Sequence, residues 1–317
     1  MSSADSVRLI LGVDGGGTST TAWLAHTPAD VVGIGRAGPS NAKAIGLPAA
    51  RQAVSEAIVS AFSHAGINRK TVDSACLGLA GFDRPEDRNL LDEWNKSEGW
   101  SKTIVHANDG DLVVAAGTPD GWGIGVIAGT GSIAVGRDRD GKKTRAGGWG
   151  YLIGDEGSAY SVVLAALRMV ARRADGRDPL PTGGDRLGER LCEALGVDSP
   201  ARIVPAIYAP GFDRARIAGL APVVLATLSE GPEIDTKILS RAGADLAEMV
   251  IAVSRSMGWP AGPFPLALAG SFLLGSDVVA NRMIDVLIQS GFQPETTRVT
   301  NPALGAVILA ERSLGDV

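Results

Sequence analysis

Two glycine-rich turns, each placed between apolar runs of strand length, constrain the fold of this chain more than any other feature. The first turn is DGGGT at residues 14–18, and the second is GTGS at residues 129–132. After each turn the next apolar run leads to a third strand, VVGIGRAG in the first case and the strand reached through the Asp140-Gly141 turn in the second. A glycine-rich hairpin that occurs twice predicts duplicated domains.

Alternating helix and strand patterns follow the first hairpin. Helical periodicity runs from about Leu47 to His64, and an apolar strand DSACLGLAG comes next. A helix from about Pro85 to Lys96, a strand TIVHAND and a helix from Gly110 complete the order βββαβαβα. Long helices, a late strand FPLALAG and a terminal helix NPALGAVILAERSL follow the second hairpin.

Length and composition restrict the classes of protein to which this chain can belong. With 317 residues the chain exceeds the usual limit of a single core, so two domains with a cleft between them are expected. Apolar residues make up 45% and charged residues 21%, which is typical of a globular protein. The net charge is -5 with acids and bases interspersed, so nucleic acid is not an expected partner.

Targeting and redox signals favour the cytoplasm. The opening segment MSSADSVRLILGVDGGG has no basic region, apolar signal core or cleavage site, and no later apolar run is long enough for a bilayer. The chain has two cysteines, Cys76 and Cys192, and neither belongs to a CxxC pair. We therefore expect a cytoplasmic protein without a membrane partner.

The first turn has the composition of a phosphate-binding site. Because Gly15, Gly16 and Gly17 lack a Cβ, successive backbone N–H groups can turn toward one anion. Asp14 at the strand end is placed to approach Mg²⁺ directly or through water, and the Thr18 hydroxyl is placed to donate to phosphate. The alternative is a tight hairpin turn that binds nothing.

The second turn supports the same interpretation. Gly129 and Gly131 expose backbone amides, and Thr130 and Ser132 add hydroxyl donors. Two such turns at equivalent places in two halves predict that both bind one polyphosphate.

Asp109 is the candidate general base. It follows the strand TIVHA, and the carboxyl ends of strands in α/β proteins carry reactive groups. A carboxylate there can accept the proton of an attacking alcohol. Asp is equally suited to capping the helix that follows, so the residues alone leave both roles open.

Glycines and acids gather again in GGWG at residues 147–150 and GDEGS at residues 154–158, before a helix. Such a loop favours close approach of a polyhydroxylated ligand. Helix capping by Asp155 or Ser158, with Trp149 in the core, is the alternative.

Gly270 and Ser271 follow the late strand PLALA. A junction of strand, glycine and helix can accept the adenosine end or the α-phosphate of a nucleotide. Ordinary packing of a helix on a strand explains the same residues.

Several segments together resemble one family. They are LGVDGGGTSTTAWLA, GPSN, GLAGF, HANDG, GVIAGTGS, AGGWGYLIGDEGSAY, LALAGS and NPALGAVILA. They resemble the eukaryotic-type N-acetylglucosamine kinases and their bacterial relatives, members of the BadF/BadG/BcrA/BcrD ATPase family in the actin, hexokinase and heat-shock-chaperone superfamily. The resemblance implies an α/β fold of two ribonuclease H-like (actin/hexokinase-type) domains, each βββαβαβα, with a cleft between them. We expect an N-terminal ATPase and sugar-binding domain at residues 1–122 and 302–317, and a C-terminal nucleotide-binding domain at residues 123–301.

The resemblance also implies roles for the matching residues. Asp109 corresponds to the family's catalytic base, which favours catalysis over capping. The GGGT turn with Asp14 and Thr18 is similar to the first phosphate loop, and GTGS with Thr130 is similar to the second. The residues implied in sugar binding are Asn41, Asp155 and the backbone of Gly147 and Gly148. Gly270 and Ser271 would face adenosine.

The implied reaction is transfer of the γ-phosphate of ATP to the 6-hydroxyl of an amino sugar, N-acetylglucosamine or glucosamine, by a homodimer. The chain differs from the vertebrate members of this family at Ile133, where those members carry an amide side chain. An apolar side chain cannot hydrogen-bond the substrate, so N-acetylmuramate and glucose also stay open as acceptors.

Two rival functions share the phosphate turns. One is an ATPase activator of a dehydratase or reductase, which places cysteines for an iron–sulfur cluster near the second turn, where this chain has none. The other is a sugar-sensing regulator, but no helix-turn-helix segment precedes the first strand.

Overall fold

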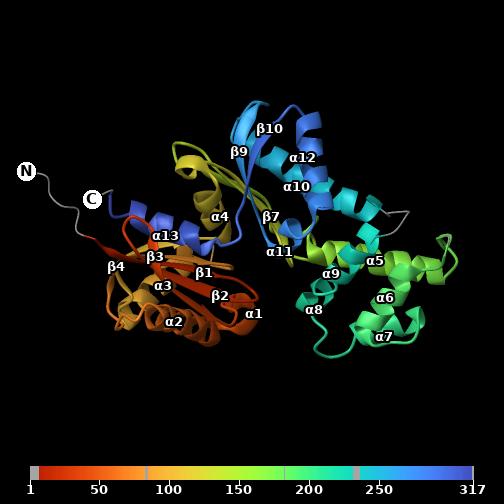
Figure 1. Ribbon diagram of the computed structural model, residues 1–317, viewed down its shortest axis with the longest axis horizontal. Coiled ribbons are helices and arrows are strands. Elements are labelled where there is room, and N and C mark those ends of the chain that lie inside the picture. The colour runs from red at the N-terminus through yellow and green to blue at the C-terminus, as the bar shows by residue number, and fades with distance from the viewer. Residues whose placement is uncertain (1–6, 83–84, 182, 231–235, 316–317) are drawn as a thin grey trace, which may run out of the picture. The chain divides into compact units, whose positions relative to one another are not determined.

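Two five-stranded sheets organise the chain, and helices pack against them (Figure 1). The computed structural model describes residues 7–82, 85–181, 183–230 and 236–315. The chain forms two compact units, unit 1 (Met1–Gly125 with Val299–Val317) and unit 2 (Val126–Arg298).

The elements alternate as the sequence patterns predict for an α/β protein. The strands are β1 (Leu9–Gly15), β2 (Thr20–His26), β3 (Asp30–Ala37), β4 (Val72–Leu79), β5 (Ser101–Ala107), β6 (Gly123–Ala128), β7 (Ser132–Arg137), β8 (Lys143–Gly147), β9 (Pro263–Ala269) and β10 (Gln293–Arg298). The α-helices are α1 (Ala42–Ile45), α2 (Leu47–His64), α3 (Pro85–Glu98), α4 (Asp109–Gly117), α5 (Ala159–Ala174), α6 (Arg186–Leu195), α7 (Ile203–Ile207), α8 (Arg214–Ala218), α9 (Ala221–Glu230), α10 (Thr236–Ser256), α11 (Ser271–Leu274), α12 (Asp277–Gln289) and α13 (Ala303–Arg312). Two short 3₁₀ helices, η1 (Pro119–Gly121) and η2 (Pro200–Arg202), complete the list.

The sheet of unit 1 has the strand order β3-β2-β1-β4-β5. The pairs β1–β2 and β2–β3 are antiparallel, whereas β4 is parallel to β1 and β5 is parallel to β4. The carboxyl ends of β1, β4 and β5 therefore lie along one edge of the sheet, and the segments that follow these strands meet there.

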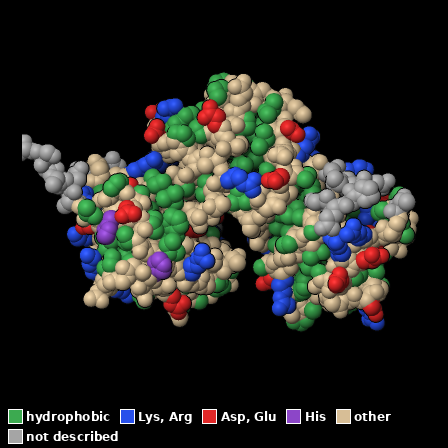
Figure 2. Space-filling view, viewed as in Figure 1, with side chains coloured by type: hydrophobic (Ala, Val, Ile, Leu, Met, Phe, Trp, Pro, Cys, Tyr) green, Lys and Arg blue, Asp and Glu red, His purple; other side chains and the backbone are tan. Residues whose placement is uncertain are grey.

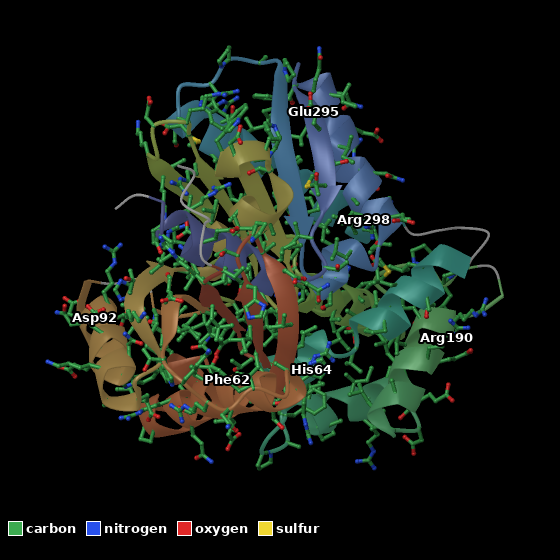
Figure 3. The ribbon with its side chains drawn as sticks, turned by 60° about the vertical axis from the view of Figure 1, so that its left-hand side comes forward. Phe62, His64, Asp92, Arg190, Glu295 and Arg298 are labelled. Atoms are coloured by element: carbon green, nitrogen blue, oxygen red, sulfur yellow. The ribbon has the colours of Figure 1, made fainter. Side chains whose placement is uncertain are left out.

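Helix α2 covers one face of this sheet (Figure 1). Its apolar positions recur at helical spacing, and the residues buried from them include Val54, Ile58 and Phe62. At its end, shown in Figure 3, the His64 Nδ1 accepts a hydrogen bond of 3.3 Å from the backbone N–H of Ile34 on β3. The helix is thus fixed to the sheet by burial along its length and by a polar contact at its end.

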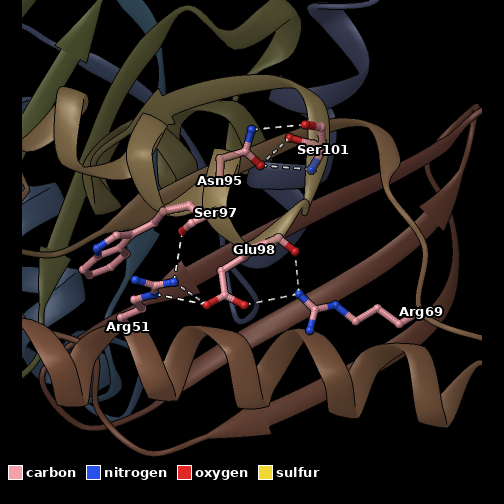
Figure 4. A network of polar contacts seen from close by, with 7 residues as sticks. Arg51, Arg69, Asn95, Ser97, Glu98 and Ser101 are labelled. Carbon is pink, nitrogen blue, oxygen red and sulfur yellow. Dashed lines mark hydrogen bonds and ion pairs between the residues drawn. The ribbon is translucent and has the colours of Figure 1, made fainter.

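A polar network joins α2 to the end of α3 (Figure 4). The Arg51 guanidinium pairs with Glu98 at 2.6 Å, and Arg69 pairs with the other oxygen of Glu98 at 3.4 Å. Nearby, the Asn95 side chain accepts from the Ser101 backbone N–H at 2.9 Å and donates to the Ser101 carbonyl at 3.1 Å. These contacts fix the start of β5, the strand that leads to Asp109.

The opposite face of the unit 1 sheet carries α4 and α13. The buried residues on this side include Ile10, Cys76, Leu112 and Val307, from two strands and both helices. Helix α13 follows unit 2 in sequence but packs on β1 and β4 of unit 1. The last helix thereby returns the chain to the unit in which it began.

The sheet of unit 2 repeats the plan, with the order β10-β9-β6-β7-β8. Read from the other edge, its strands follow the same order as those of unit 1: third, second, first, fourth and fifth. Strands β7 and β8 are antiparallel, and β9 and β10 are parallel. The shared order confirms the prediction of two related α/β domains that each begin with a glycine-turn hairpin.

Several expected elements match the structure closely. Helix α2 has the predicted bounds, and α3 extends the predicted helix slightly, to Glu98. The β7–β8 connection contains Asp140-Gly141, and Gly141 has a positive φ of 84°. Strand β10, which runs through the Glu295 and Arg298 labelled in Figure 3, was not located from the sequence.

Charged side chains of both signs are interspersed over the face of the molecule seen in Figure 2. This pattern agrees with the modest net charge of -5. Within the described residues, no helix combines the length and the apolar character needed to cross a bilayer.

Candidate functional site

The first predicted phosphate turn connects β1 and β2 in unit 1. Asp14 is partly buried near the end of β1 and pairs with Thr21 on β2 and Gly78 on β4. The Gly16 N–H closes the turn by donating to the Ser19 carbonyl at 3.0 Å. The N–H groups of the next two residues, Gly17 and Thr18, donate to no described residue. Two adjacent backbone donors are therefore available to an anion.

The glycines of this turn differ in why the fold needs them. A Cβ on Gly15 would collide with the Ser40 hydroxyl and lie 2.5 Å from a Leu79 methyl group, so packing explains this glycine. A Cβ on Gly16 would have its nearest neighbour at 3.8 Å, and a Cβ on Gly17 would meet nothing within 4 Å. Neither has a positive φ. The turn itself therefore does not require glycine at Gly16 or Gly17.

Two other loops of unit 1 are tied to this turn by backbone hydrogen bonds. The Ser40 N–H donates to the Gly16 carbonyl at 3.0 Å, and the Ala80 N–H donates to the Gly15 carbonyl at 2.7 Å. The segments after β3 and β4 are thus held against the phosphate turn.

Asn41 lies in the segment after β3, where it caps α1. Its Oδ1 accepts from the Lys43 N–H at 3.1 Å, and its amide nitrogen donates to no described residue. Gly81, with a φ of 89°, lies beside it, and a Cβ on Gly81 would come within 2.9 Å of the Asn41 Oδ1. Gly81 was not singled out from the sequence, although its left-handed backbone makes room for the predicted sugar-binding amide.

Asp109 is the first residue of α4, and it is not the helix cap. Asn108 caps the helix by accepting from the Asp111 N–H at 2.8 Å, and the Asp111 carboxylate accepts from the Asn108 N–H at 3.2 Å. The alternative role for Asp109 as N-cap is therefore wrong. Its carboxylate is half-buried, and its Oδ1 accepts from the adjacent Gly110 N–H at 3.0 Å.

Asp14 and Asp109 influence each other electrostatically. Burial, and to a smaller extent the negative charge of Asp109, raises the pKa of the Asp14 carboxyl from 3.8 to about 7. A like charge has this effect only over a short range, so unit 1 brings the predicted metal ligand and the predicted base together.

The second turn connects β6 and β7 in unit 2. The Gly129 N–H donates to the Gly131 carbonyl, and the Ala159 N–H at the start of α5 donates to the Gly129 carbonyl, both at 2.9 Å. The N–H groups of Thr130 and Gly131 donate to no described residue. Gly129 has no positive φ, and a Cβ on it would meet nothing within 4 Å. The second turn therefore repeats two features of the first, free adjacent donors and a glycine that the fold does not require.

Ser132 is committed to contacts within unit 2. Its hydroxyl donates to the Glu156 carbonyl at 2.5 Å, and its N–H donates to the Asp155 Oδ1 at 3.3 Å. The hydroxyl hydrogen predicted to reach phosphate is thus engaged elsewhere in this structure.

The end of β8 and the loop that follows it contain the other predicted sugar-binding groups. Gly147 and Gly148 have φ values of 76° and 70°, and a Cβ on Gly148 would lie 2.8 Å from the Ile133 Cδ1. Asp155, with a φ of 60°, is only 4% exposed. Its Oδ2 lies 2.9 Å from the Arg214 Nη2. Arg214 was not singled out from the sequence.

Trp149 is not part of the core. It is 69% exposed, and Leu152 and Ile153 in the same loop are 81% and 74% exposed. The assignment of Trp149 to the core is therefore wrong, whereas the helix cap in the same alternative is confirmed, since the Ser158 Oγ accepts from the Ser161 N–H at 3.2 Å.

Gly270 and Ser271 link β9 to α11. Gly270 has a φ of 93°, and a Cβ on it would lie 2.8 Å from the backbone nitrogen of Ala128, the last residue of β6. The junction is therefore close to the start of the second turn. Ser271 is exposed.

The donor set of unit 1 fits Mg²⁺ bound together with phosphate. Among the described residues, no group of three or more His, Cys, Asp or Glu side chains could hold a metal by itself. Mg²⁺ usually keeps several waters and takes one or two carboxylates plus phosphate oxygens. Asp14 is one such carboxylate, and a cation beside it would lower the pKa that burial and the negative charge of Asp109 raise.

Known proteins share the sequence and the fold along nearly the whole chain. The family model described as the BadF/BadG/BcrA/BcrD ATPase family matches residues 11–310. The N-acetylmuramic acid/N-acetylglucosamine kinase of Clostridium acetobutylicum is 29% identical over 96% of this chain and 98% of its own length. The N-acetyl-D-glucosamine kinase of Dictyostelium discoideum is 28% identical over 97% of this chain and 99% of its own.

A solved structure confirms the fold. It is that of a candidate N-acetylglucosamine kinase from Chromobacterium violaceum, which is 27% identical and has a TM-score of 0.75, covering 96% of this chain and 99% of that one. The expected α/β fold of two hexokinase- and actin-type domains is thus confirmed. Since the family model spans nearly all of the sequence, the chain belongs to the BadF/BadG/BcrA/BcrD ATPase family.

Proposed function

We propose that this protein is a sugar kinase that uses ATP and Mg²⁺ to phosphorylate the 6-hydroxyl of an amino sugar, N-acetylglucosamine or glucosamine. The family to which it belongs is one of ATPases. Relatives in two distant organisms, matched over nearly their full lengths, are named as kinases of N-acetylglucosamine, and one of them also as a kinase of N-acetylmuramic acid.

One observation about the chain itself carries the proposal. Gly17 and Gly129 are glycines that neither backbone conformation nor packing requires, and each stands beside two N–H groups without a described acceptor. A hairpin turn that bound nothing would tolerate a side chain at either position. Close approach of a phosphate oxygen to the backbone accounts for both the missing side chains and the available donors.

Asp109 acts as the general base in this proposal. The capping of α4 by Asn108 and Asp111 holds the first turn of the helix, so Asp109 is positioned by the fold without providing the cap itself. Its carboxylate takes the proton of the sugar's 6-hydroxyl as that oxygen attacks. Bound ATP with Mg²⁺ supplies the phosphoryl group and neutralises its charge.

The remaining residues bind and orient the two substrates. Asp14 holds the metal ion directly or through water, and the free N–H groups of the two turns hold phosphate oxygens. Asn41, Asp155 and the backbone at Gly147 and Gly148 orient the sugar hydroxyls. Gly270 and Ser271 border the adenosine.

A coupled assay of ADP release tests the proposal. The acceptors are N-acetylglucosamine, glucosamine, N-acetylmuramic acid and glucose, with a reaction lacking sugar as the control. We expect one of the amino sugars to give the highest kcat/KM and phosphorus NMR of its product to show a 6-phosphate. ADP release that no sugar increases contradicts the kinase assignment, and a preference for N-acetylmuramic acid or glucose corrects the acceptor.

The rival function of an iron–sulfur activator finds no support in the cysteines. Cys76 on β4 and Cys192 on α6 are both buried, and they belong to different units. A cluster held between subunits needs cysteine sulfurs at the surface of each subunit. We expect the purified protein to be colourless and to contain no iron.

A further inference from the structure

Arg214 begins α8 and reaches the second phosphate turn through a single buried carboxylate. Its Nη2 lies 2.9 Å from the Asp155 Oδ2, while the Asp155 Oδ1 accepts from the Ser132 N–H at 3.3 Å. Ser132 is the residue that ends the turn and begins β7. The guanidinium and the turn are therefore bound to opposite oxygens of the same carboxylate.

The guanidinium also lies directly against the turn. Its Nη2 is the nearest atom to the place that a Cβ on Gly131 would take, and the Asp155 Oδ1 is the next at 2.8 Å, so a side chain there would displace the guanidinium or the carboxylate. On another side, the Arg214 Cζ lies 5.6 Å from the centre of the Tyr151 ring, and Tyr151 packs edge-to-face on Tyr160 of α5 at 5.4 Å. Contacts with the carboxylate, the turn and the ring fix the position of the guanidinium.

Most of the hydrogen-bonding capacity of Arg214 is unused by the protein. A guanidinium has five N–H donors in a planar fork. Asp155 is its sole ion-pair partner among the described residues, and Arg214 donates no hydrogen bond to any of them, because the contact with Asp155 is an ion pair alone. The side chain remains 34% exposed. A fixed, partly exposed guanidinium beside the free N–H groups of Thr130 and Gly131 is suited to an anion with several oxygens.

We propose that Arg214 is a phosphate-binding residue of unit 2, which donates to the nucleotide phosphate held by the N–H groups of Thr130 and Gly131. The assignment rests on the proposed function, because it takes the β6–β7 turn as a nucleotide phosphate site. Asp155 then has a structural role beside any contact with sugar, since it sets the position of the guanidinium.

The alternative explanation is that Arg214 only stabilises the structure around Asp155 and does not contact phosphate. Asp155 is almost fully buried, and removing its only described cation leaves a buried charge unpaired. That alone could distort the turn and weaken nucleotide binding indirectly. A variant that removes both charges separates the two explanations, because the amide introduced by Asp155→Asn keeps an oxygen to accept from the Ser132 N–H.

Calorimetric binding of ATP and of adenosine, without any sugar, tests the proposal independently of catalysis. We expect Arg214→Gln to weaken ATP binding about 10- to 100-fold, because this is the effect of losing a hydrogen bond between charged groups. Adenosine binding should be unchanged, because adenosine has no phosphate. Arg214→Lys should have a smaller effect, because lysine keeps the charge but lacks the fork. Arg216→Gln is the matched control, since Arg216 lies on the same helix and its guanidinium faces the Phe212 ring.

The double variant Asp155→Asn with Arg214→Gln decides between the explanations, and it does so even if Arg214→Gln alone fails to fold. We expect the double variant to bind ATP as weakly as Arg214→Gln, with its melting temperature close to that of the wild type. Wild-type ATP affinity in the double variant overturns the proposal. Unchanged ATP affinity in Arg214→Gln overturns it too while leaving the kinase assignment intact, whereas failure of the wild type to bind ATP overturns both.

Discussion

Asp109 and Asp111 are neighbouring acids in the first turn of α4 with different tasks. Asp111 and Asn108 satisfy each other's backbone N–H groups, which is a capping box. Asp109 is not part of this capping box, but its negative charge helps to raise the pKa of Asp14. The local sequence NDGD could not tell whether Asn108 or Asp109 caps the helix, because Asn and Asp are both good caps and the register of the helix start decides between them.

Replacing Asp109 tests its role as base. Asp109→Asn keeps the size of the side chain and removes the proton acceptor, so kcat should fall about 10²- to 10⁴-fold with an unchanged melting temperature. Asp111→Asn is the control, since the amide oxygen still accepts from Asn108, and it should retain most of the activity. The measurement is steady-state kinetics on both variants. Near-normal turnover in a folded Asp109→Asn variant rules out this base.

The raised pKa of Asp14 predicts how stability depends on pH. The folded protein holds the Asp14 proton up to a pKa of about 7, whereas the unfolded chain releases it near 3.8. Between these values the folded state binds more protons, so the free energy of unfolding should fall as pH rises, by at most about 1.4 kcal/mol per pH unit. Urea denaturation without metal or nucleotide, from pH 4.5 to pH 8, measures this.

Asp14→Asn is the comparison for that series, because it lacks the titrating group. Its stability should exceed that of the wild type more at pH 8 than at pH 4.5, although it should lose activity. A difference between the two proteins that does not change with pH shows that Asp14 has an ordinary pKa.

Trp149 and Arg214 in unit 2 have positions that the local sequence pattern does not predict. Trp149 has a large apolar side chain of the kind usually found in a core. Glycines on both sides place it in a loop, where it is exposed. Arg214 lies far in sequence from the turn that it contacts, and no local spacing connects the two. Only the packing of α8 against α5 brings them together.

At the level of elements, the contact of α13 with α4 completes unit 1. Gly305 on α13 is buried, and a Cβ there would collide with the backbone carbonyl of Leu112 on α4. The small residues Ala303, Gly305 and Ala306 at the start of α13 let the two helices approach closely. Since α4 begins at Asp109, this contact also helps to fix the position of the helix that carries the proposed base.

Gly305→Ala tests how tightly these helices pack. Helix propensity alone predicts that alanine stabilises the protein by about 1 kcal/mol. The added methyl group collides with a backbone atom that cannot rotate away. We therefore expect alanine to destabilise the protein instead, lowering the free energy of unfolding by about 1–3 kcal/mol. Chemical denaturation measures it, with Glu311→Ala on the same helix as the control, expected to stay within about 0.5 kcal/mol of the wild type. A more stable Gly305→Ala variant contradicts the close contact.

Helix α2 and strand β10 differ in how strongly the sequence encodes them. Helix α2 was located to the residue, because its buried positions recur at helical spacing and a proline stands near its start. Strand β10 was missed because QPETTR has no alternation of apolar and polar residues. It lies at the sheet edge with five of its six residues exposed, so it is held by backbone pairing with β9 and not by burial.

At the level of the whole molecule, two units share one strand order, and each carries a glycine turn between its first two strands. This duplication could be predicted because both hairpins keep the same signal, apolar strands around glycines. The expected boundaries near residues 122 and 302 and the division of labour between the domains stay predictions. Much of unit 2 consists of the helices α5 to α10. Their arrangement could not be predicted from the sequence, because apolar periodicity shows which face of a helix is buried but not which helix packs against it.

Both turns are proposed to bind nucleotide phosphate, and the ATP affinity of the variants Gly17→Ala and Gly129→Ala is the sharpest test of this role. Neither added methyl group meets a protein atom, so the melting temperatures should equal that of the wild type. Gly315→Ala, where the nearest atom lies at 3.6 Å, is the matched control. We expect each turn variant to bind ATP about 10- to 100-fold more weakly by calorimetry, because the methyl group blocks contact between phosphate and the backbone N–H groups. Wild-type ATP affinity in both folded variants would show that the two turns do not bind the phosphates of ATP.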